Sequence, residues 1–117
     1  IKVDDDGVGG GVTDKLRDMG AKNVIPVHNG GKPSDEKLYT TCADEQWFTL
    51  PIDKISIPDD ADLMAELSAR QYKYTPDDRK KIEPKADFKK RYGRSPDKAD
   101  ALLLCFYKPK RKTFAIL

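Results

Sequence analysis

Two groups of aspartates have the residue type and the spacing for metal chemistry. Asp4, Asp5 and Asp6 follow a short apolar segment, and Asp97 and Asp100 lie three residues apart near the other end of the chain. Residues three apart share one face of a helix, so the two later carboxylates are expected together in a first helical turn. Adjacent carboxylates repel one another, and a cation beside them relieves that repulsion. Hard carboxylate oxygens prefer Mg²⁺ or Mn²⁺ to zinc.

The residues after Asp100 favour a metal-ligand role for at least one acid of the later pair. Residues 101–106 are all apolar, which predicts a largely buried helix. A carboxylate on the buried face of such a helix costs free energy unless a cation lies beside it. Both groups also have a purely structural interpretation. Asp4 would then belong to an exposed acidic turn, and Asp97 and Asp100 would stabilise the positive end of a helix dipole.

Basic residues are concentrated in the second half of the chain. The net charge is only +2, but residues 79–94 contain eight basic and two acidic side chains, and residues 108–117 contain four basic ones. Aromatic residues such as Tyr72, Tyr74 and Phe88 are interleaved with this basic stretch. Such a surface can follow a phosphate backbone. A solvated helix face with aromatic anchors in the core explains the pattern equally well.

Three other features exclude common classes of site. The glycine-rich stretch 7–11 lacks the spacing of a dinucleotide-binding loop, and no Gly-Lys-Ser/Thr follows it, so a structural turn is favoured over nucleotide binding. His28 is the single histidine, which excludes most histidine-centred catalysis within this chain. Cys42 and Cys105 have neither zinc-site spacing nor the pattern of a disulfide framework.

The elements that position the first acids form half of an α/β unit. With 117 residues the chain can build one modest core. Residues 1–4 and 23–27 are predicted as strands, and they flank the glycine loop and a helix over 12–19 that Gly20 ends. Strands joined in this way are parallel. Ligands of such sheets bind at the carboxyl ends of the strands, where Asp4 is expected.

The rest of the chain predicts four helices and a hairpin. Helices are expected over 41–50, from Asp60 through Leu67, over 85–91 up to Gly93, and from Pro96 towards 109. Residues 72–74 and 80–83 are predicted to pair around a turn at 76–78. The expected buried faces consist of Ala43, Trp47 and Leu50 in the first of these helices and Leu63, Met64 and Leu67 in the second.

The ends of the helices also have sequence signals. An aspartate of the segment Pro58-Asp59-Asp60 is expected to cap the second of these helices, and Ser95 the last, with Pro96 at its first helical position. No apolar stretch reaches the length that spans a membrane; the longest is 101–107.

Three segments together resemble a known family. They are Val-Asp-Asp-Asp-Gly-Val-Gly-Gly-Gly-Val at 3–12, Leu-Ser-Ala-Arg-Gln-Tyr-Lys-Tyr at 67–74, and Arg-Tyr-Gly-Arg-Ser-Pro-Asp-Lys-Ala-Asp-Ala-Leu at 91–102. In this order and spacing, they make the chain similar to the C-terminal nuclease domain of the large terminase subunit, the DNA-packaging protein of tailed phages and prophages. The resemblance extends from residue 1 to about residue 107.

The resemblance implies the C-terminal portion of an RNase H-like (RuvC-like) α/β nuclease fold, with two parallel core strands, flanking helices and a β-hairpin. It implies a divalent-metal-dependent endonuclease that cleaves concatemeric double-stranded DNA during genome packaging. Asp4, Asp97 and Asp100 match positions of the family's catalytic, metal-binding acids, which hold two Mg²⁺ or Mn²⁺ ions. The family's first catalytic aspartate and its ATPase domain would precede Ile1. We therefore expect 1–117 to be a partial nuclease domain that is inactive alone, with a basic tail over 108–117.

The resemblance also implies partners and a location. These are double-stranded DNA, the terminase small subunit and the portal protein, in the cytoplasm of a bacterial host, with no membrane. A non-catalytic DNA-binding or motor-docking module is the alternative. The residues expected to contact DNA are Lys80, Lys81, Lys85, Lys89, Lys90, Arg91 and Arg94.

Overall fold

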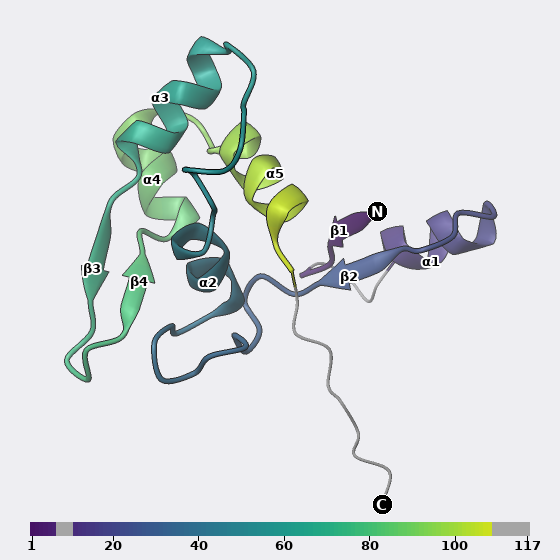
Figure 1. Cartoon of the computed structure of the whole chain (residues 1–117), viewed down its shortest axis with the longest axis horizontal. Coiled ribbons are helices and arrows are strands. Elements are labelled where there is room, and N and C mark those ends of the chain that lie inside the picture. The colour runs from purple at the N-terminus through teal and green to yellow at the C-terminus, as the bar shows by residue number, and fades with distance from the viewer. Residues whose placement is uncertain (7–10, 109–117) are drawn as a thin grey trace, which may run out of the picture.

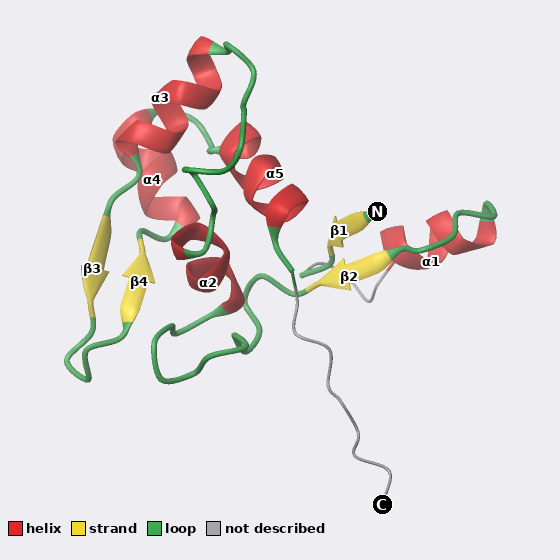
Figure 2. Cartoon of the chain, in the orientation of Figure 1, coloured by secondary structure: helices red, strands yellow, loops and turns green. Residues whose placement is uncertain are grey.

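The computed structural model describes residues 1–6 and 11–108, which form an α/β arrangement of two separate strand pairs and five helices. Figures 1 and 2 show the two strand pairs at opposite sides of the molecule, with most of the helices between them. No helix in the described ranges is both long and apolar enough to cross a membrane. The elements are β1 (Lys2–Asp4), α1 (Gly11–Asp18), β2 (Ile25–Val27), α2 (Cys42–Phe48), α3 (Ala61–Ala69), β3 (Tyr72–Tyr74), β4 (Lys80–Ile82), α4 (Lys85–Tyr92) and α5 (Asp97–Phe106).

The first strand pair confirms the predicted parallel unit. β1 and β2 run parallel, with Val3 opposite Pro26 and Asp4 opposite Val27. Most of the predicted glycine loop, residues 7–10, lies outside the described residues. α1 follows; its Val12 is 58% exposed, and Met19, directly after the helix, is 73% exposed. These two side chains do not pack into the core, because α1 extends along the outer edge of the molecule (Figure 1).

α2 begins where the sequence predicts, but it buries polar side chains where an apolar face was expected. Thr41 caps it, accepting a hydrogen bond from the Asp44 backbone, and the Asp44 carboxylate accepts one from the Thr41 backbone. The predicted apolar face was wrong, since Asp44 and Glu45 are buried whereas Trp47 is half-buried. These buried carboxylates are stable because backbone N–H groups bind them, from Ile82 to Asp44 and from Ser34 to Glu45.

The remaining helices enclose the core. α3 packs against α5, and Leu63, Phe88, Ala99 and Leu103 are buried among these elements. A second cluster, of Val27, Cys42, Leu104 and Tyr107, connects β2, α2 and the end of α5. An aspartate caps α3 as predicted, and it is Asp60 of the two candidates, but Met64 of that helix is 48% exposed rather than buried. α4 ends at Gly93, whose φ of 97° suits glycine.

The start of α5 differs from its prediction. The helix begins at Asp97, and the residue that precedes it is Pro96, with no side-chain cap from that residue in the described structure. Ser95 is therefore not the cap. Glu66 of α3 takes that role from outside the helix, because its Oε1 accepts a hydrogen bond from the Lys98 backbone at 3.2 Å. Glu66 is 1% exposed.

The second strand pair is the predicted hairpin. β3 and β4 are antiparallel, with Tyr72 opposite Ile82 and Tyr74 opposite Lys80. Tyr39 makes an isolated parallel bridge to Lys80, so the loop before α2 lies along the other edge of β4.

Candidate metal centre

Asp4 and Asp100 line one open cleft, although ninety-six positions separate them in the sequence. Asp4 ends β1, and Asp100 lies in the first turn of α5, which contacts β1. The cleft has a volume of about 460 Å³, and Asp6, Trp47 and residues 81–85 contribute to its walls. The fold thus brings two of the three predicted site acids to one cleft.

Asp97 does not line this cleft. Its side chain is 79% exposed, against 31% for Asp100. Asp97 is the first residue of α5, and three residues along a helix correspond to a rotation of about 60° from one side chain to the other. This offset is consistent with the difference between them, since Asp100 lines the cleft and Asp97 does not.

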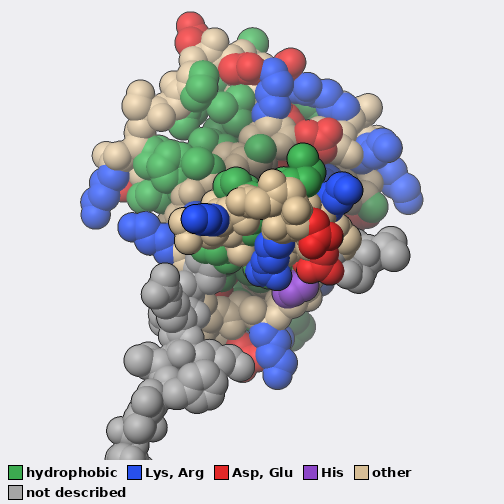
Figure 3. Space-filling view, turned by 90° about the vertical axis from the view of Figure 1, so that its right-hand side faces the viewer, with side chains coloured by type: hydrophobic (Ala, Val, Ile, Leu, Met, Phe, Trp, Pro, Cys, Tyr) green, Lys and Arg blue, Asp and Glu red, His purple; other side chains and the backbone are tan. Residues whose placement is uncertain are grey.

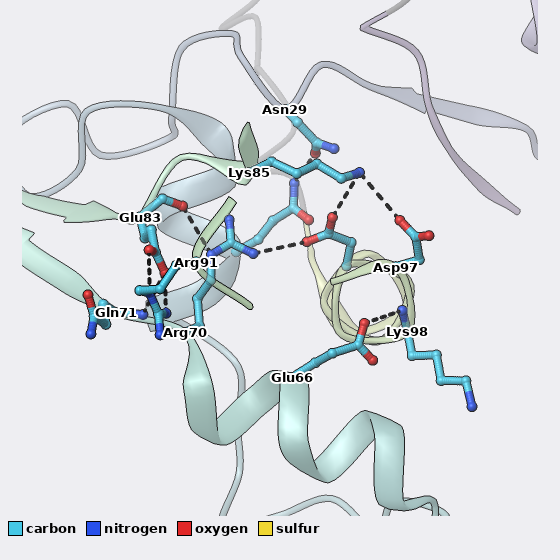
Figure 4. Close-up of polar contacts among 11 residues, drawn as sticks. Asn29, Glu66, Arg70, Gln71, Glu83, Lys85, Arg91, Asp97 and Lys98 are labelled. Carbon is cyan, nitrogen blue, oxygen red and sulfur yellow. Dashed lines mark hydrogen bonds and ion pairs between the residues drawn. The ribbon is translucent and has the colours of Figure 1, made fainter. Parts of the chain in front are cut away.

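Lys85 is the cation beside these acids. Its Nζ lies 3.1 Å from Oδ2 of Asp100 and 3.8 Å from Oδ1 of Asp97, as Figure 4 shows for the labelled pair Lys85 and Asp97. Burial alone lowers the pKa of Lys85. The contact with Asp100 and the negative charges of Asp100, Asp97 and Asp4 outweigh burial and raise the pKa above its ordinary value of 10.5.

Arg70 supports Asp100 from the interior. Its side chain is 6% exposed, its Nη1 lies 3.7 Å from Oδ1 of Asp100, and its Nε donates a hydrogen bond to the Glu83 carbonyl at 3.0 Å. The guanidinium carbon lies 5.7 Å from the Trp47 ring centroid and 5.5 Å from that of Phe88. Burial lowers the pKa of Arg70, and the charges of Asp100, Glu83 and Asp44 oppose that shift. Arg70 belongs to the family-like segment 67–74, but its contact with Asp100 could not be predicted, because its partners are distant along the chain.

Asp5 and Asp6 have backbone roles next to Asp4. The Asp6 carboxylate accepts a hydrogen bond from the Gly30 backbone at 2.7 Å, and the Asp5 backbone donates one to the Val27 carbonyl at 3.0 Å. These bonds hold the segment after β1 against the segment after β2. They therefore fix the path of the backbone directly after Asp4.

The carboxylate oxygens of the cleft are the kind of ligand that a hard divalent cation prefers, but the described residues provide too few of them to hold one. Asp4 and Asp100 present carboxylate oxygens to one cleft, and a cationic group, the Lys85 ammonium, already lies against Asp97 and Asp100. Within residues 1–6 and 11–108, however, no three His, Cys, Asp or Glu side chains come close enough together to hold a metal ion.

The residues expected to contact DNA divide into two groups. Arg91 binds Glu83 with two hydrogen bonds of 2.9 and 2.7 Å, Arg94 lies 3.3 Å from Asp62, and Lys85 pairs with the acids of α5. The other four have no ion pair within the described part of the chain: Lys80, Lys81, Lys89 and Lys90.

Charge is mixed over the surface that carries α1. In Figure 3, Lys and Arg side chains alternate there with Asp and Glu, and the single histidine lies beside acidic side chains. His28 is exposed and contributes no side-chain hydrogen bond among the described residues.

Comparison with known proteins gives matches in structure alone. No protein-family model and no curated protein matches the sequence. The nuclease domain of the large terminase subunit gp2 of bacterial virus Sf6 matches with a TM-score of 0.70 and 19% identity, over 93% of this chain and 65% of that one. A variant of the same domain, solved with manganese and beta-thujaplicinol, gives a TM-score of 0.69. A variant solved with calcium gives 0.62 at 18% identity, over 92% of this chain and 64% of that one.

The chain thus spans about 65% of the length of the structures it matches. The match in turn covers 93% of this chain. The fold predicted from the three sequence segments is confirmed: this chain has the RNase H-like α/β fold of the nuclease domain of a phage large terminase subunit.

Proposed function

We propose that this chain is the metal-dependent endonuclease portion of a DNA-packaging terminase, which cleaves concatemeric double-stranded DNA during genome packaging. One observation carries the proposal. On a terminase nuclease fold, Asp4 at the carboxyl end of β1 and Asp100 of α5 line the same cleft. The carboxyl ends of parallel strands are where α/β folds bind ligands.

Three acids are proposed to hold the metal. Asp4, Asp97 and Asp100 would provide carboxylate oxygens for Mg²⁺ or Mn²⁺, with a further ligand expected from the longer parent protein. Bound metal would supply a water of lowered pKa and would stabilise the leaving oxygen of the cleaved phosphodiester. Structures of the matched domain contain manganese in two cases and calcium in another, which supports a divalent ion.

Basic side chains of the chain itself lie beside these acids, and others are proposed to position the DNA. Two cations lie beside the Asp100 carboxylate, with Nη1 of Arg70 at 3.7 Å from its Oδ1 and Nζ of Lys85 at 3.1 Å from its Oδ2. Contacts to the phosphate backbone position a duplex without reading its bases, so low sequence specificity is expected. We propose these residues for that contact: Lys80, Lys81, Lys85, Lys89, Lys90, Arg91 and Arg94.

The proposed partners follow from the same fold. Double-stranded DNA would be the substrate, and the terminase small subunit and portal protein would be neighbours of the parent protein in the host cytoplasm. A second candidate function is a non-catalytic DNA-binding or motor-docking module. The absence of a three-carboxylate cluster in the described part of the chain favours this candidate.

Two measurements separate the candidates. In the full-length parent, Asp4→Asn and Asp100→Asn should each abolish Mg²⁺-dependent cleavage of a linear duplex while the circular dichroism spectrum stays unchanged. Asp18→Asn, an exposed aspartate at the end of α1, is the matched control. In the 117-residue chain, Mn²⁺ should broaden the amide resonances of Asp4 and Asp100. Retained cleavage by both variants would overturn the assignment of these acids. No cleavage by the unmodified parent, together with no response to Mn²⁺, would support the non-catalytic module instead.

A further inference from the structure

An aromatic row runs from the core onto the exposed hairpin. Ring centroids lie 6.2 Å apart between Tyr39 and Phe48, 5.3 Å between Phe48 and Tyr72, and 6.1 Å between Tyr72 and Tyr74. The inner end of the row is buried, since Tyr39 is 8% exposed, whereas Tyr72 and Tyr74 are 57% and 55% exposed. Two neighbouring aromatic side chains therefore remain largely uncovered at the end of a row whose other end is fixed in the core.

The exposed rings share one face of the hairpin. Tyr72 and Tyr74 are two residues apart on β3, so their side chains emerge on the same face, and their cross-strand partners Ile82 and Lys80 emerge there too. Ile82 is buried beneath this face and Lys80 lies at its edge, with its ammonium 5.4 Å from the Phe48 ring centroid. The hairpin stands at the side of the molecule opposite β1, β2 and α1 (Figure 1).

The two strands of the hairpin are positively charged. They contain three lysines and no acid, and none of the three forms an ion pair within the described residues. The turn between the strands contains Asp77, Asp78 and Arg79, and Arg79 pairs with Asp77 at 2.8 Å. On the face opposite the tyrosines, Lys73 lies directly across from Lys81. Like charges in this position destabilise a strand pair, and a polyanion along the hairpin would relieve the repulsion.

We propose that this hairpin face, formed by Tyr72, Tyr74 and Lys80, is a stacking surface for unpaired bases of single-stranded DNA. Aromatic rings stack on bases only when the base faces are exposed, and in a duplex those faces are covered by neighbouring base pairs. Proteins that bind single strands combine stacking rings with cations for the backbone. Here Lys80 lies on the face of the tyrosines, and Lys73 and Lys81 lie on the opposite face of the same hairpin. The inference goes beyond duplex cleavage and requires none of the carboxylates of the cleft.

The test measures binding of the 117-residue chain to labelled oligo(dT) of about 12 nucleotides by fluorescence anisotropy. The double variant Tyr72→Ala/Tyr74→Ala should weaken binding by about fivefold or more for each tyrosine removed. The double variant Tyr72→Phe/Tyr74→Phe keeps both rings and should bind as the unmodified chain does. Affinity for a duplex of the same length should be the same in all three proteins.

A second measurement does not depend on the folding of the alanine variants. Addition of oligo(dT) to the unmodified chain should shift the ring-proton resonances of Tyr72 and Tyr74 and leave those of Tyr92, on α4, in place. Unshifted tyrosine rings, or equal affinity of the alanine variant for oligo(dT), would overturn the proposal. Equal losses for duplex and single strand would assign the face to duplex contact, and concentration-dependent self-association abolished by the alanine variant would assign it to a second copy of the chain. Both outcomes would also overturn it.

The outcome is separable from that of the proposed nuclease function. Asp4→Asn and Asp100→Asn remove the proposed metal ligands and should leave oligo(dT) binding intact. Loss of cleavage with retained single-strand binding in those variants supports both proposals. Retained cleavage with retained binding overturns only the metal-site assignment.

Discussion

The ammonium of Lys85 lies 3.1 Å from the carboxylate of Asp100, and it reaches Asp97 as well. Lys85 begins α4 and the two acids begin α5, so this contact joins the N-terminal ends of two helices. A group that neutralises the acids of the cleft in this way competes with any other cation for the same oxygens.

Lys85→Met should therefore increase the affinity of the cleft for Mn²⁺. The pair is half exposed, and such pairs contribute up to about 1 kcal/mol, which corresponds to a gain of up to about fivefold. The measurement is a titration that follows Mn²⁺ broadening of the Asp100 amide. Lys89→Met, on the same helix and without an ion pair in the described residues, is the control. An affinity that stays the same or falls in Lys85→Met would contradict the prediction.

Glu66→Ala should lower the free energy of unfolding by about 2 kcal/mol, through the loss of the helix cap and of a buried side chain. Glu66 is buried, and its carboxylate accepts the hydrogen bond from the Lys98 backbone that α5 receives in place of a local cap. Glu66→Gln keeps an acceptor of similar size and should lose less. Urea denaturation followed by circular dichroism measures both. Asp62→Asn, an exposed acid of the same helix, should change stability by under about 0.5 kcal/mol.

Tyr107→Phe should remove part of the loss of stability at alkaline pH. Burial raises the pKa of the Tyr107 phenol above its ordinary value of 10.0, so the folded state keeps the proton where the unfolded state releases it. The stabilisation is complete below pH 10 and decreases as pH rises above it, by at most about 1.4 kcal/mol per pH unit. Urea denaturation between pH 9 and 11 should show a shallower decline for Tyr107→Phe. Parallel declines in the two proteins would show that Tyr107 does not contribute.

Glu83→Gln should make stability less sensitive to acid. The hydrogen bonds from Arg91, and to a lesser degree that from the Gln71 backbone, hold the pKa of the Glu83 carboxyl below its ordinary value of 4.5. A lowered pKa stabilises the folded state above pH 4.5, and that contribution disappears as pH falls through the folded-state pKa. Unfolding curves from pH 6 down to 3 should therefore converge for the two proteins at the acid end. A difference that stays constant over this range would indicate that only side-chain shape matters at this position.

Features of the fold that depend on residues close together in the sequence were predicted correctly. The aspartate cap of α3, the stop at Gly93 and the Tyr72–Tyr74 strand of the hairpin are all confirmed, because each rests on backbone conformations or bonds within a few residues. The face of α2 was wrong for the opposite reason. Asp44 is buried only because the Ile82 backbone, thirty-eight residues away, donates a hydrogen bond to it.

The candidate site shows the same division. The position of Asp4 at a strand end and of Asp100 in a helix that needs a cation could be predicted from local pattern and burial, and both acids line the cleft. The cations themselves could not, since Lys85 and Arg70 reach Asp100 from α4 and from the end of α3. Ser95 was misassigned as the cap because Glu66, which takes that role, comes from another helix.

Pro26 has a consequence for how the parallel sheet can grow. Ile25 and Val27 turn their backbone bonds toward β1, with Ile25 donating to the Ile1 carbonyl and Val27 accepting from Asp5. Pro26, between them, occupies the position whose N–H would point away from β1, and proline has none. The outer side of β2 is therefore closed to regular pairing. Any added strand, from this polypeptide or another, would join beside β1, on the side where Asp4 ends the strand.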